Sequence, residues 1–404
     1  MSIIKNYNSF GGRHWETGSV HNVLDFQGAI APHTGKAFSE EFLLGVSGGI
    51  AVGYFLFHYE GYQPQLVLIT RNTFDPQQTL LERMGIVQNI LQSPSAEKGK
   101  ANLLSVLEEG LPAIAWADSM ALPYNALDSD ENYWAMQPLV VFGHDGEKVH
   151  IADRSNKPFS VDADIFAKAQ GRVKKLKHRV LSIENPIEEK IVSAASSGIW
   201  QCISLFIEAP PRGTKNNFGL QALQHWAKML TNTRNAKSWA RYFPITEGTF
   251  AALAGSLPFP GLYDWILAWG DGGGERYRYA DFLDEAATLL NKPKLSQAGT
   301  IFRESGDAWK ALGMIALPNE IPLLSQSRIL LEKRHDIFTE NAPGAEEKLR
   351  AINLQLKELL ANSEQEHPIS EDDALALRSA MSNQLASIHD IEENAVRAMQ
   401  SAMT

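Results

Sequence analysis

The sequence predicts two domains, an α+β domain over residues 1–186 and an all-α domain over residues 187–404. Three observations support this prediction. The chain has 404 residues, more than one ordinary hydrophobic core needs. Segments rich in β-branched and aromatic residues, typical of strands, occur before Asn185. After Pro186 the apolar residues follow a helical spacing almost throughout. We therefore place the domain boundary near residue 186.

The first domain is expected to begin with a helix and to continue into an antiparallel sheet. Residues 16–26 place Val20, Val23 and Leu24 on one helical face, and Glu16 supplies an acidic first turn. A short helix follows from Ser39. The further elements expected are strands at 48–55 and 65–70, helices at 75–89 and 96–109, and strands at 111–118, 139–146 and 148–153, the last two as a hairpin.

The second domain is expected to consist of helices. Ser370 is the predicted N-cap of the last one. The last two helices are long and charged, and we expect them to form a surface hairpin that provides a homo-oligomer contact. The expected helices cover residues 187–207, 219–230, 236–242, 246–253, 260–269, 279–290, 296–317, 320–341, 345–363 and 371–403.

The charge balance excludes some classes of partner. A net charge of −10 disfavours nucleic acid and anionic membrane, because both require a basic surface. The one dense basic cluster covers residues 174–179, and a solvated face is favoured over a docking surface for an acidic carrier protein. The first residues contain too few apolar side chains for a signal peptide, and no uninterrupted apolar run approaches the roughly 18 residues of a membrane span. We expect a cytoplasmic protein.

Cys202 is the only cysteine, so an intramolecular disulfide and a multi-cysteine metal site are excluded. It lies in an apolar helical segment, which favours a buried structural thiol over a relocated nucleophile. The eleven histidines are scattered without metal-ligand spacing, and no metal site is expected.

The N-terminal segment resembles a known family. Residues 12–17 read Gly-Arg-His-Trp-Glu-Thr and are followed by Gly18–Leu24 and Phe42–Gly49. This arrangement resembles the N-terminal domain of the butirosin biosynthesis protein H family, acyltransferases of antibiotic assembly. The resemblance implies a papain-like (cysteine-peptidase-like) fold. In that family a His-Cys-Glu triplet opens the first helix, and the cysteine is the expected nucleophile because the helix dipole stabilises its thiolate. Trp15 stands at that position, and an indole has no ionisable thiol.

The resemblance also locates the other two residues of a catalytic triad. The family's base is a histidine that opens the strand before a Gly-aromatic-Asp turn, and Gln137 holds that position here. The alternative is a different register around Gln137. The orienting aspartate corresponds to Asp153. The triad is therefore degenerate at Trp15 and Gln137 and retained at Asp153, although the indole and the amide can still bind ligands.

Several side chains near Trp15 are candidates for a relocated catalytic group. His14 and Glu16 flank it, and Thr17, Ser19 and His21 follow within two turns. A dyad built on Ser19 would need a base from elsewhere, for which His144 and His58 are candidates. For each of these side chains, capping or packing is the alternative role.

A strand end further along the chain matches the family's pattern of Asp followed by Leu-Pro-Tyr. Asp118 and Tyr124 hold these positions. In a papain-like fold this strand end lies near the cleft, so both are candidate substrate contacts. Capping of the turn by Asp118 is equally compatible with the sequence.

The second domain contains a glycine-rich loop. Residues 217–220, 225–227 and 270–287 resemble an uncharacterised helical domain that accompanies the butirosin H-like fold. Its loop contains Gly270, Gly272, Gly273 and Gly274. Such a loop exposes backbone N–H groups to an oxyanion, and Arg276 or Arg278, with Tyr279 nearby, would bind a carboxylate or a phosphopantetheine phosphate. The alternative is close helix packing, with Arg276 paired to Asp281 or Asp284.

The family resemblance implies acyl transfer in specialised metabolism. We expect an acyl group to pass from a carrier-protein thioester to a small amine without a covalent cysteine intermediate, with His14 or Glu16 as the base. No cofactor is expected other than the phosphopantetheine arm of an acyl carrier protein. The alternative is a catalytically inactive pseudoenzyme that binds an acyl carrier or a biosynthetic partner.

Overall fold

The computed structural model describes residues 2–128, 132–245, 247–267, 271–366 and 369–404. Its internal contacts divide the chain into two compact units that alternate along the sequence. The sequence boundary expected near residue 186 stays a prediction, because these units are defined by contacts. Unit 1 comprises Met1–Leu43, Pro76–Ala194 and Asp336–Ala351, and unit 2 comprises Leu44–Asp75, Ala195–His335 and Ile352–Thr404.

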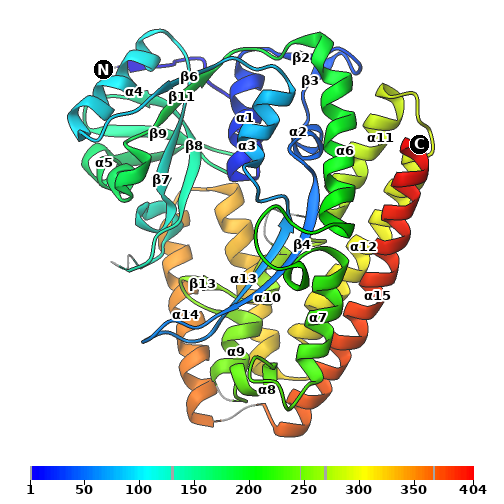
Figure 1. Cartoon of the computed structure of the whole chain (residues 1–404). Helices are drawn as coiled ribbons and strands as arrows, with labels where there is room; N and C mark the ends of the chain where they lie inside the picture. Colours follow the sequence, from blue (N-terminus) through cyan, green and yellow to red (C-terminus); the bar gives the residue numbers. More distant parts are fainter. Residues whose placement is uncertain (1, 129–131, 246, 268–270, 367–368) are drawn as a thin grey trace. The chain divides into compact units, whose positions relative to one another are not determined.

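An antiparallel sheet forms the centre of unit 1 (Figure 1). Its strands lie in the order β10-β9-β8-β7-β11-β6, and β1 pairs with β8. The central strand β8 is buried continuously from Pro138 to His144, which is expected when both faces of a sheet are covered. The strands are β1 (Ser2–Ile3), β6 (Gln88–Leu91), β7 (Ala113–Asp118), β8 (Met136–His144), β9 (Lys148–Ala152), β10 (Phe159–Asp162) and β11 (Val180–Ile183).

Helices cover both faces of this sheet. Figure 1 shows α1 and α3 on one side and α4 and α5 on the other. Apolar residues of α1 lie on the buried face, as its spacing predicts. The α+β class of the N-terminal region is therefore confirmed. These helices are α1 (Trp15–Phe26), α3 (Pro76–Arg83), α4 (Ala96–Glu108) and α5 (Ala163–Gly171), and a small ribbon pairs β2 (Ile30–Ala31) with β3 (Lys36–Ala37).

Two parts of unit 1 differ from the expectation. The helix expected over 75–89 ends at Arg83, because Gly85 adopts a positive φ of 67° and the chain then enters β6. The basic cluster at 174–179 forms a 3-10 turn that leads into β11, a strand the sequence did not predict. Strand β10 and helix α5 were also missed.

Unit 2 is mainly helical, as expected. A two-stranded ribbon of β4 and β5 belongs to it. A second ribbon, of β12 and β13, occurs where no strand was expected. It begins at Gly255, whose positive φ of 97° ends the preceding helix. Four helices, α2, α6, α13 and α14, contain residues of both units. The elements are α2 (Glu40–Val46), β4 (Ile50–Phe57), β5 (Gln65–Arg71), α6 (Ile191–Ile207), α7 (Gly219–Thr231), α8 (Trp239–Tyr242), α9 (Glu247–Ala254), β12 (Gly255–Ser256), β13 (Phe259–Pro260), α10 (Leu262–Leu267), α11 (Arg276–Leu289), α12 (Leu295–Ala316), α13 (Pro322–Glu340), α14 (Ala345–Glu366) and α15 (Glu371–Met403).

The last helix, α15, buries one of its faces within the protein, and the surface hairpin expected for it stays a prediction. One face of α15, with Met381, Leu385 and Met399, is buried and packs against α12 and α7. Its charged residues lie mostly on the other face, which is why the composition suggested a surface position. The predicted N-cap is confirmed, because Ser370 and Asp373 form a reciprocal capping box. The oligomer contact stays a prediction.

One helical segment meets the length and hydropathy criteria for a membrane span. Among the described residues, Glu188–Ile207 is long and apolar enough, and half of it is buried within the protein. A core helix of a globular protein has the same properties, so this is weak support for a membrane span.

Candidate functional site

Helix α1 begins in a tightly packed loop of unit 1. His14 is its N-cap, with an extended backbone, and its Nδ1 accepts a hydrogen bond from the Glu16 amide at 3.2 Å. Gly12 is needed in this loop because a Cβ there would lie 2.3 Å from the Gly18 carbonyl oxygen. The loop therefore lies directly against the first turn, and Trp15 is the first helical residue.

A buried carboxylate, Glu40, binds the chain entering α1. It accepts hydrogen bonds from the Arg13 amide at 2.6 Å, the His14 amide at 2.9 Å and the Thr17 hydroxyl at 2.8 Å. Glu40 is only 5% exposed. Helix N-termini bind anions, and here the anion is the protein's own side chain. Sequence reasoning missed Glu40. The acidic pair Glu40-Glu41 at the start of α2 was the available signal.

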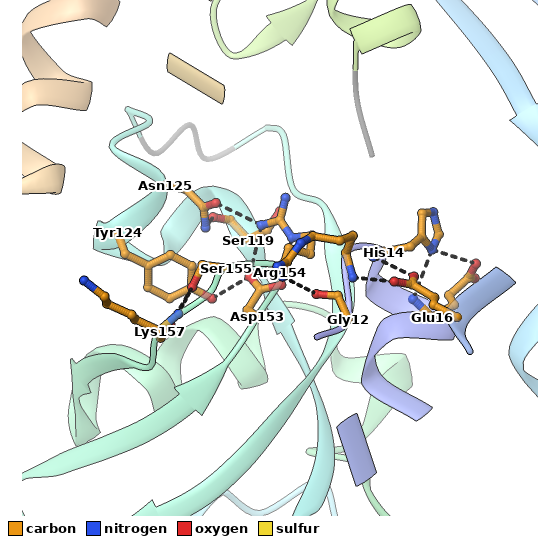
Figure 2. A network of polar contacts seen from close by, with 12 residues as sticks. Gly12, His14, Glu16, Ser119, Tyr124, Asn125, Asp153, Arg154, Ser155 and Lys157 are labelled. Carbon is orange, nitrogen blue, oxygen red and sulfur yellow. Dashed lines mark hydrogen bonds and ion pairs between the residues drawn. The ribbon is translucent and has the colours of Figure 1, made fainter. Parts of the chain in front are cut away.

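The Trp15 ring lies against the guanidinium of Arg154. Figure 2 shows that guanidinium beside Asp153. The Arg154 Cζ atom lies 4.3 Å from the Trp15 ring centroid. Arg154 donates from Nε to Asp153 Oδ1 at 2.7 Å and from Nη2 to Oδ2 at 3.0 Å. This bidentate pairing is the strongest hydrogen-bonding geometry between an arginine and a carboxylate. Asp153 is thus linked to Trp15 through Arg154.

The same carboxylate also binds Tyr124. The Tyr124 hydroxyl donates to Asp153 Oδ2 at 2.9 Å, and Asn125 Oδ1 accepts from Arg154 Nη2 at 3.1 Å. Burial, with the Asp153 charge second, raises the pKa of Tyr124 well above its usual value, so it stays protonated. Figure 2 shows these residues as one polar network. The structure therefore brings together Trp15, Tyr124 and Asp153, as the sequence predicted, and adds Arg154.

A segment far along the chain completes this cluster. The Phe338 ring centroid lies 4.7 Å from Arg154 Cζ and 5.5 Å from the Phe159 ring. The Asn156 amide donates to the Thr339 carbonyl at 2.7 Å, which fixes this contact. Phe338 belongs to the part of α13 that lies in unit 1. No local pattern could have placed it beside Arg154.

The other candidates around α1 have specific positions. Glu16 Oε2 lies 4.0 Å from His14 Nδ1, and the Glu16 side chain is 30% exposed. The Ser19 hydroxyl donates to the Glu16 carbonyl and accepts from Gln77. His21 Nδ1 is 2.9 Å from a backbone carbonyl, that of Phe38. Ser19 and His21 thus have the packing role considered for them.

Asp118 and Gln137 lie on neighbouring strands. Asp118 ends β7, is 2% exposed and accepts from the Met120 and Ala135 amides, at 3.2 and 2.9 Å. It thus caps its turn, and its carboxylate lies 3.6 Å from Arg172. Gln137 is half-buried at the second position of β8, which begins three residues earlier than the expected strand at 139–146.

Two histidines considered as bases for Ser19 lie elsewhere in the fold. His144 is buried at the end of β8, where its Nδ1 accepts the Gly146 amide at 3.0 Å. Burial lowers its pKa. His58 belongs to unit 2.

The glycine-rich loop of unit 2 is closed by an aspartate. Asp271 Oδ1 accepts from the Gly273 amide at 2.9 Å and the Glu275 amide at 3.1 Å, so these donors are already used. A Cβ at Gly273 would lie 2.5 Å from the Tyr277 ring and 3.1 Å from the Gly306 Cα atom. Close packing of α11 on α12 therefore explains this glycine. Gly272 has a φ of 65°, and Gly270 lies outside the described residues.

Arg276 is fully buried in unit 2. It donates from Nε to Glu392 at 2.7 Å, from Nη1 to the Thr70 and Gly274 carbonyls at 3.0 and 2.6 Å, and from Nη2 to the Ala51 carbonyl at 3.0 Å. Its exposed fraction is 0%. A ligand could reach this guanidinium only if the core opened.

The ion pairs expected for Arg276 are formed by another arginine. Asp281 and Asp284 both bind Arg303, at 2.6 and 2.7 Å, so the expected pairing with Arg276 is wrong. The partner of Arg276 lies 116 residues away, which no local pattern indicates. Tyr279 is also buried, with its hydroxyl 3.6 Å from the Met399 sulfur.

Cys202 is a buried thiol, as expected. It donates to the Ile50 carbonyl at 3.3 Å, and burial raises its pKa to about 12. The thiolate is therefore not formed near neutral pH, and a nucleophilic role is excluded. Within the described part of the chain, no group of three or more histidine, cysteine, aspartate or glutamate side chains could hold a metal ion.

Comparison with protein families agrees with the resemblance seen in the sequence. Residues 14–154 match the family model described as butirosin biosynthesis protein H, N-terminal. Residues 263–320 match a second model, the domain of unknown function DUF4872. No curated protein matches the chain. The first match includes Trp15, Gln137 and Asp153, so the recognition of the family's N-terminal domain is confirmed, while the loss of its catalytic residues stays a prediction.

Proposed function

We propose that this protein binds an acyl carrier, or the thioester it bears, in specialised-metabolite biosynthesis, without turning it over. The observation that supports this is the Asp153–Arg154–Trp15 arrangement. Thiol catalysis requires a nucleophile that ionises and a base that accepts its proton. Trp15 cannot ionise in this way, and both carboxylate oxygens of Asp153 already accept hydrogen bonds from Arg154.

The start of α1 supports the same proposal. An acyl-transfer site stabilises the oxyanion with preorganised N–H donors. The Arg13 and His14 amides already donate to the buried Glu40 carboxylate. A second negative charge beside Glu40 would be repelled in this poorly solvated environment. The family match supports a place in butirosin-type biosynthesis. Because the amides at the start of α1 are already bound by Glu40, binding without chemistry is the function that fits best.

A second candidate function is direct aminolysis of a bound thioester, with Glu16 as the base. The observation in its favour is the partial exposure of the Glu16 side chain beside the His14 imidazole. A thioester is already activated, so orientation and one base would suffice. His14 itself is a poor base, because its Nδ1 lone pair accepts the Glu16 amide and its side chain is 8% exposed.

The test combines binding and turnover on the full chain. Acyl-carrier thioesters and small amines are incubated with the wild type, Glu16→Gln and His14→Asn, and amide product is followed by mass spectrometry. Asparagine keeps the N-cap acceptor. Carrier binding by calorimetry with no product above background supports the proposal. Product lost in Glu16→Gln but kept in the exposed control Glu189→Gln establishes the second candidate. Absence of both binding and product overturns both, and so does a covalent acyl-protein adduct.

A further inference from the structure

Arg154 has hydrogen-bond donors that the described structure does not use. A guanidinium carries five N–H groups. The Nε group and one Nη2 group donate to Asp153, and the second Nη2 group donates to Asn125. The two N–H groups of Nη1 have no acceptor among the described residues. Nη1 is not among the buried side-chain atoms that lack a partner, so solvent reaches it, and an anion can take the place of that water.

The surroundings restrict how such an acceptor can approach. The guanidinium carbon lies over two aromatic rings, at 4.3 Å from the Trp15 centroid and 4.7 Å from the Phe338 centroid. Asp153 and Asn125 occupy the edge formed by Nε and Nη2. The side chain is 15% exposed, so part of it reaches solvent. The edge at Nη1 is therefore the one open to a ligand.

The backbone of Arg154 is held in an unfavourable conformation. Its φ is 52°, in the left-handed region that non-glycine residues seldom adopt. Such strain persists only where the surrounding structure enforces it, and it gathers at binding sites. Here the enforcing contacts are the Asp153 pair and the two aromatic rings, which together fix the direction of the guanidinium.

We infer that Nη1 of Arg154 anchors an anionic oxygen of the bound ligand, either a carboxylate or a phosphate. This inference rests on the proposed binding function and names the chemical group that the site recognises. Both anions match the donor spacing of a guanidinium. A carrier-borne thioester presents the phosphodiester of its phosphopantetheine arm, and an acyl group with a terminal acid presents a carboxylate.

Small probes separate the two sources. Binding of 4′-phosphopantetheine is compared with that of pantetheine, and binding of glutarate with that of its diamide, by calorimetry on the wild-type protein. We expect one anionic probe to bind at least about tenfold more tightly than its neutral partner, because a charge-assisted hydrogen bond is lost in the latter. Tighter binding of phosphopantetheine identifies the phosphate, and tighter binding of glutarate identifies the carboxylate.

Variants connect this preference to Arg154. Arg154→Met keeps the length of the side chain and removes all donors, so the preference for the anion should vanish. Arg172→Met is the matched control, because Arg172 also pairs with a buried aspartate of unit 1, at 3.6 Å, and should keep the preference. Far-UV circular dichroism checks folding. The comparison of probes on the wild type needs no variant, so it remains decisive if Arg154→Met does not fold.

Two failures can be told apart. If the wild type binds a holo carrier protein but shows no preference for either anion, the inference is overturned and the proposed function stands. The same holds if the preference survives in folded Arg154→Met. If the wild type binds no carrier protein but prefers an anionic probe through Arg154, the proposed partner is wrong and the anion site stands.

Discussion

Arg154 in unit 1 and Arg276 in unit 2 have the same kinds of neighbours but differ in how deeply they are buried. Each arginine pairs with a carboxylate at 2.7 Å and lies over a tryptophan ring, Trp15 at 4.3 Å and Trp309 at 4.8 Å. Arg276 is fully buried, whereas the Arg154 side chain is 15% exposed. Burial and use of the donors, rather than residue type, thus separate a structural arginine from one that can bind a ligand.

The difference follows from where the acceptors come from. Arg276 binds the carbonyls of Ala51 in β4 and Thr70 in β5 and the side chain of Glu392 in α15, so it joins the β4–β5 ribbon to the last helix. Asp153, the partner of Arg154, is its neighbour in sequence. Pairing with its own neighbour uses only Nε and Nη2 of Arg154, so Nη1 remains available for other contacts.

The largest effect is expected from Glu392→Ala, which leaves the Arg276 charge buried without its partner. Breaking a buried pair in this way costs about 3–5 kcal/mol of unfolding free energy. Urea denaturation measures the loss. Glu393→Ala is the control, because Glu393 pairs with Arg397 on the surface and should cost about 0.5 kcal/mol or less. Equal losses for the two variants would contradict the structural role of Arg276.

Asp153→Ala tests the other arginine. It removes the acceptor of the buried Tyr124 hydroxyl and the partner of Arg154, so we expect a loss of about 2–3 kcal/mol in the same assay. Tyr124→Phe removes only the hydroxyl and keeps the ring stacked on Phe159, so it should cost about 1 kcal/mol. If Asp153→Ala were no worse than Tyr124→Phe, the pair with Arg154 would add nothing to stability.

Gly273→Ala tests whether Gly273, in the loop before α11, is required for the close packing of α11 on α12. The added methyl overlaps the Tyr277 ring and approaches the Gly306 backbone, so we expect a loss of about 1–2 kcal/mol. Gly272→Ala meets nothing within 4 Å and is strained only by its φ of 65°, at about 1 kcal/mol. Thermal unfolding compares the two. A neutral Gly273→Ala would reopen the possibility that this loop binds a ligand.

The smallest effect concerns the pH dependence of stability in unit 1. Burial lowers the pKa of His178 in unit 1 below 6.5. The unfolded chain therefore binds the proton first as pH falls below 6.5, and the folded state loses stability by at most about 1.4 kcal/mol per pH unit. His178→Asn removes this dependence, and asparagine tolerates the φ of 46° at this position. Urea denaturation at pH 7.5 and 5.5 should show a smaller difference for the variant. An unchanged difference would exclude His178.

The sequence was informative where the deciding contacts are local. The Ser370 cap was predicted because a capping residue lies within three positions of the amide it binds. Helix α1 was predicted from its apolar spacing and begins one residue before the expected start. The end of α3 was missed although Gly85 was a local signal. Strand β11 was hidden because it follows a basic cluster.

The candidate site was only half predictable for the same reason. Family resemblance pointed to Trp15, Tyr124 and Asp153, and the structure gathers them. Arg154 was overlooked although it follows Asp153 directly. Glu40 and Phe338 act across 23 and more residues of chain, so no periodicity could place them. Pairing of distant side chains is set by packing, which a single sequence does not display.

Glu40 sets a condition for engineering a reactive cysteine into this protein. A thiol in place of Trp15 would lie beside two backbone amides that already donate hydrogen bonds to the Glu40 carboxylate. Nearby negative charge disfavours a thiolate and raises the pKa of the thiol, which offsets the help of the helix dipole. Reviving nucleophilic chemistry here would therefore require Glu40→Gln in addition to a new cysteine and a new imidazole.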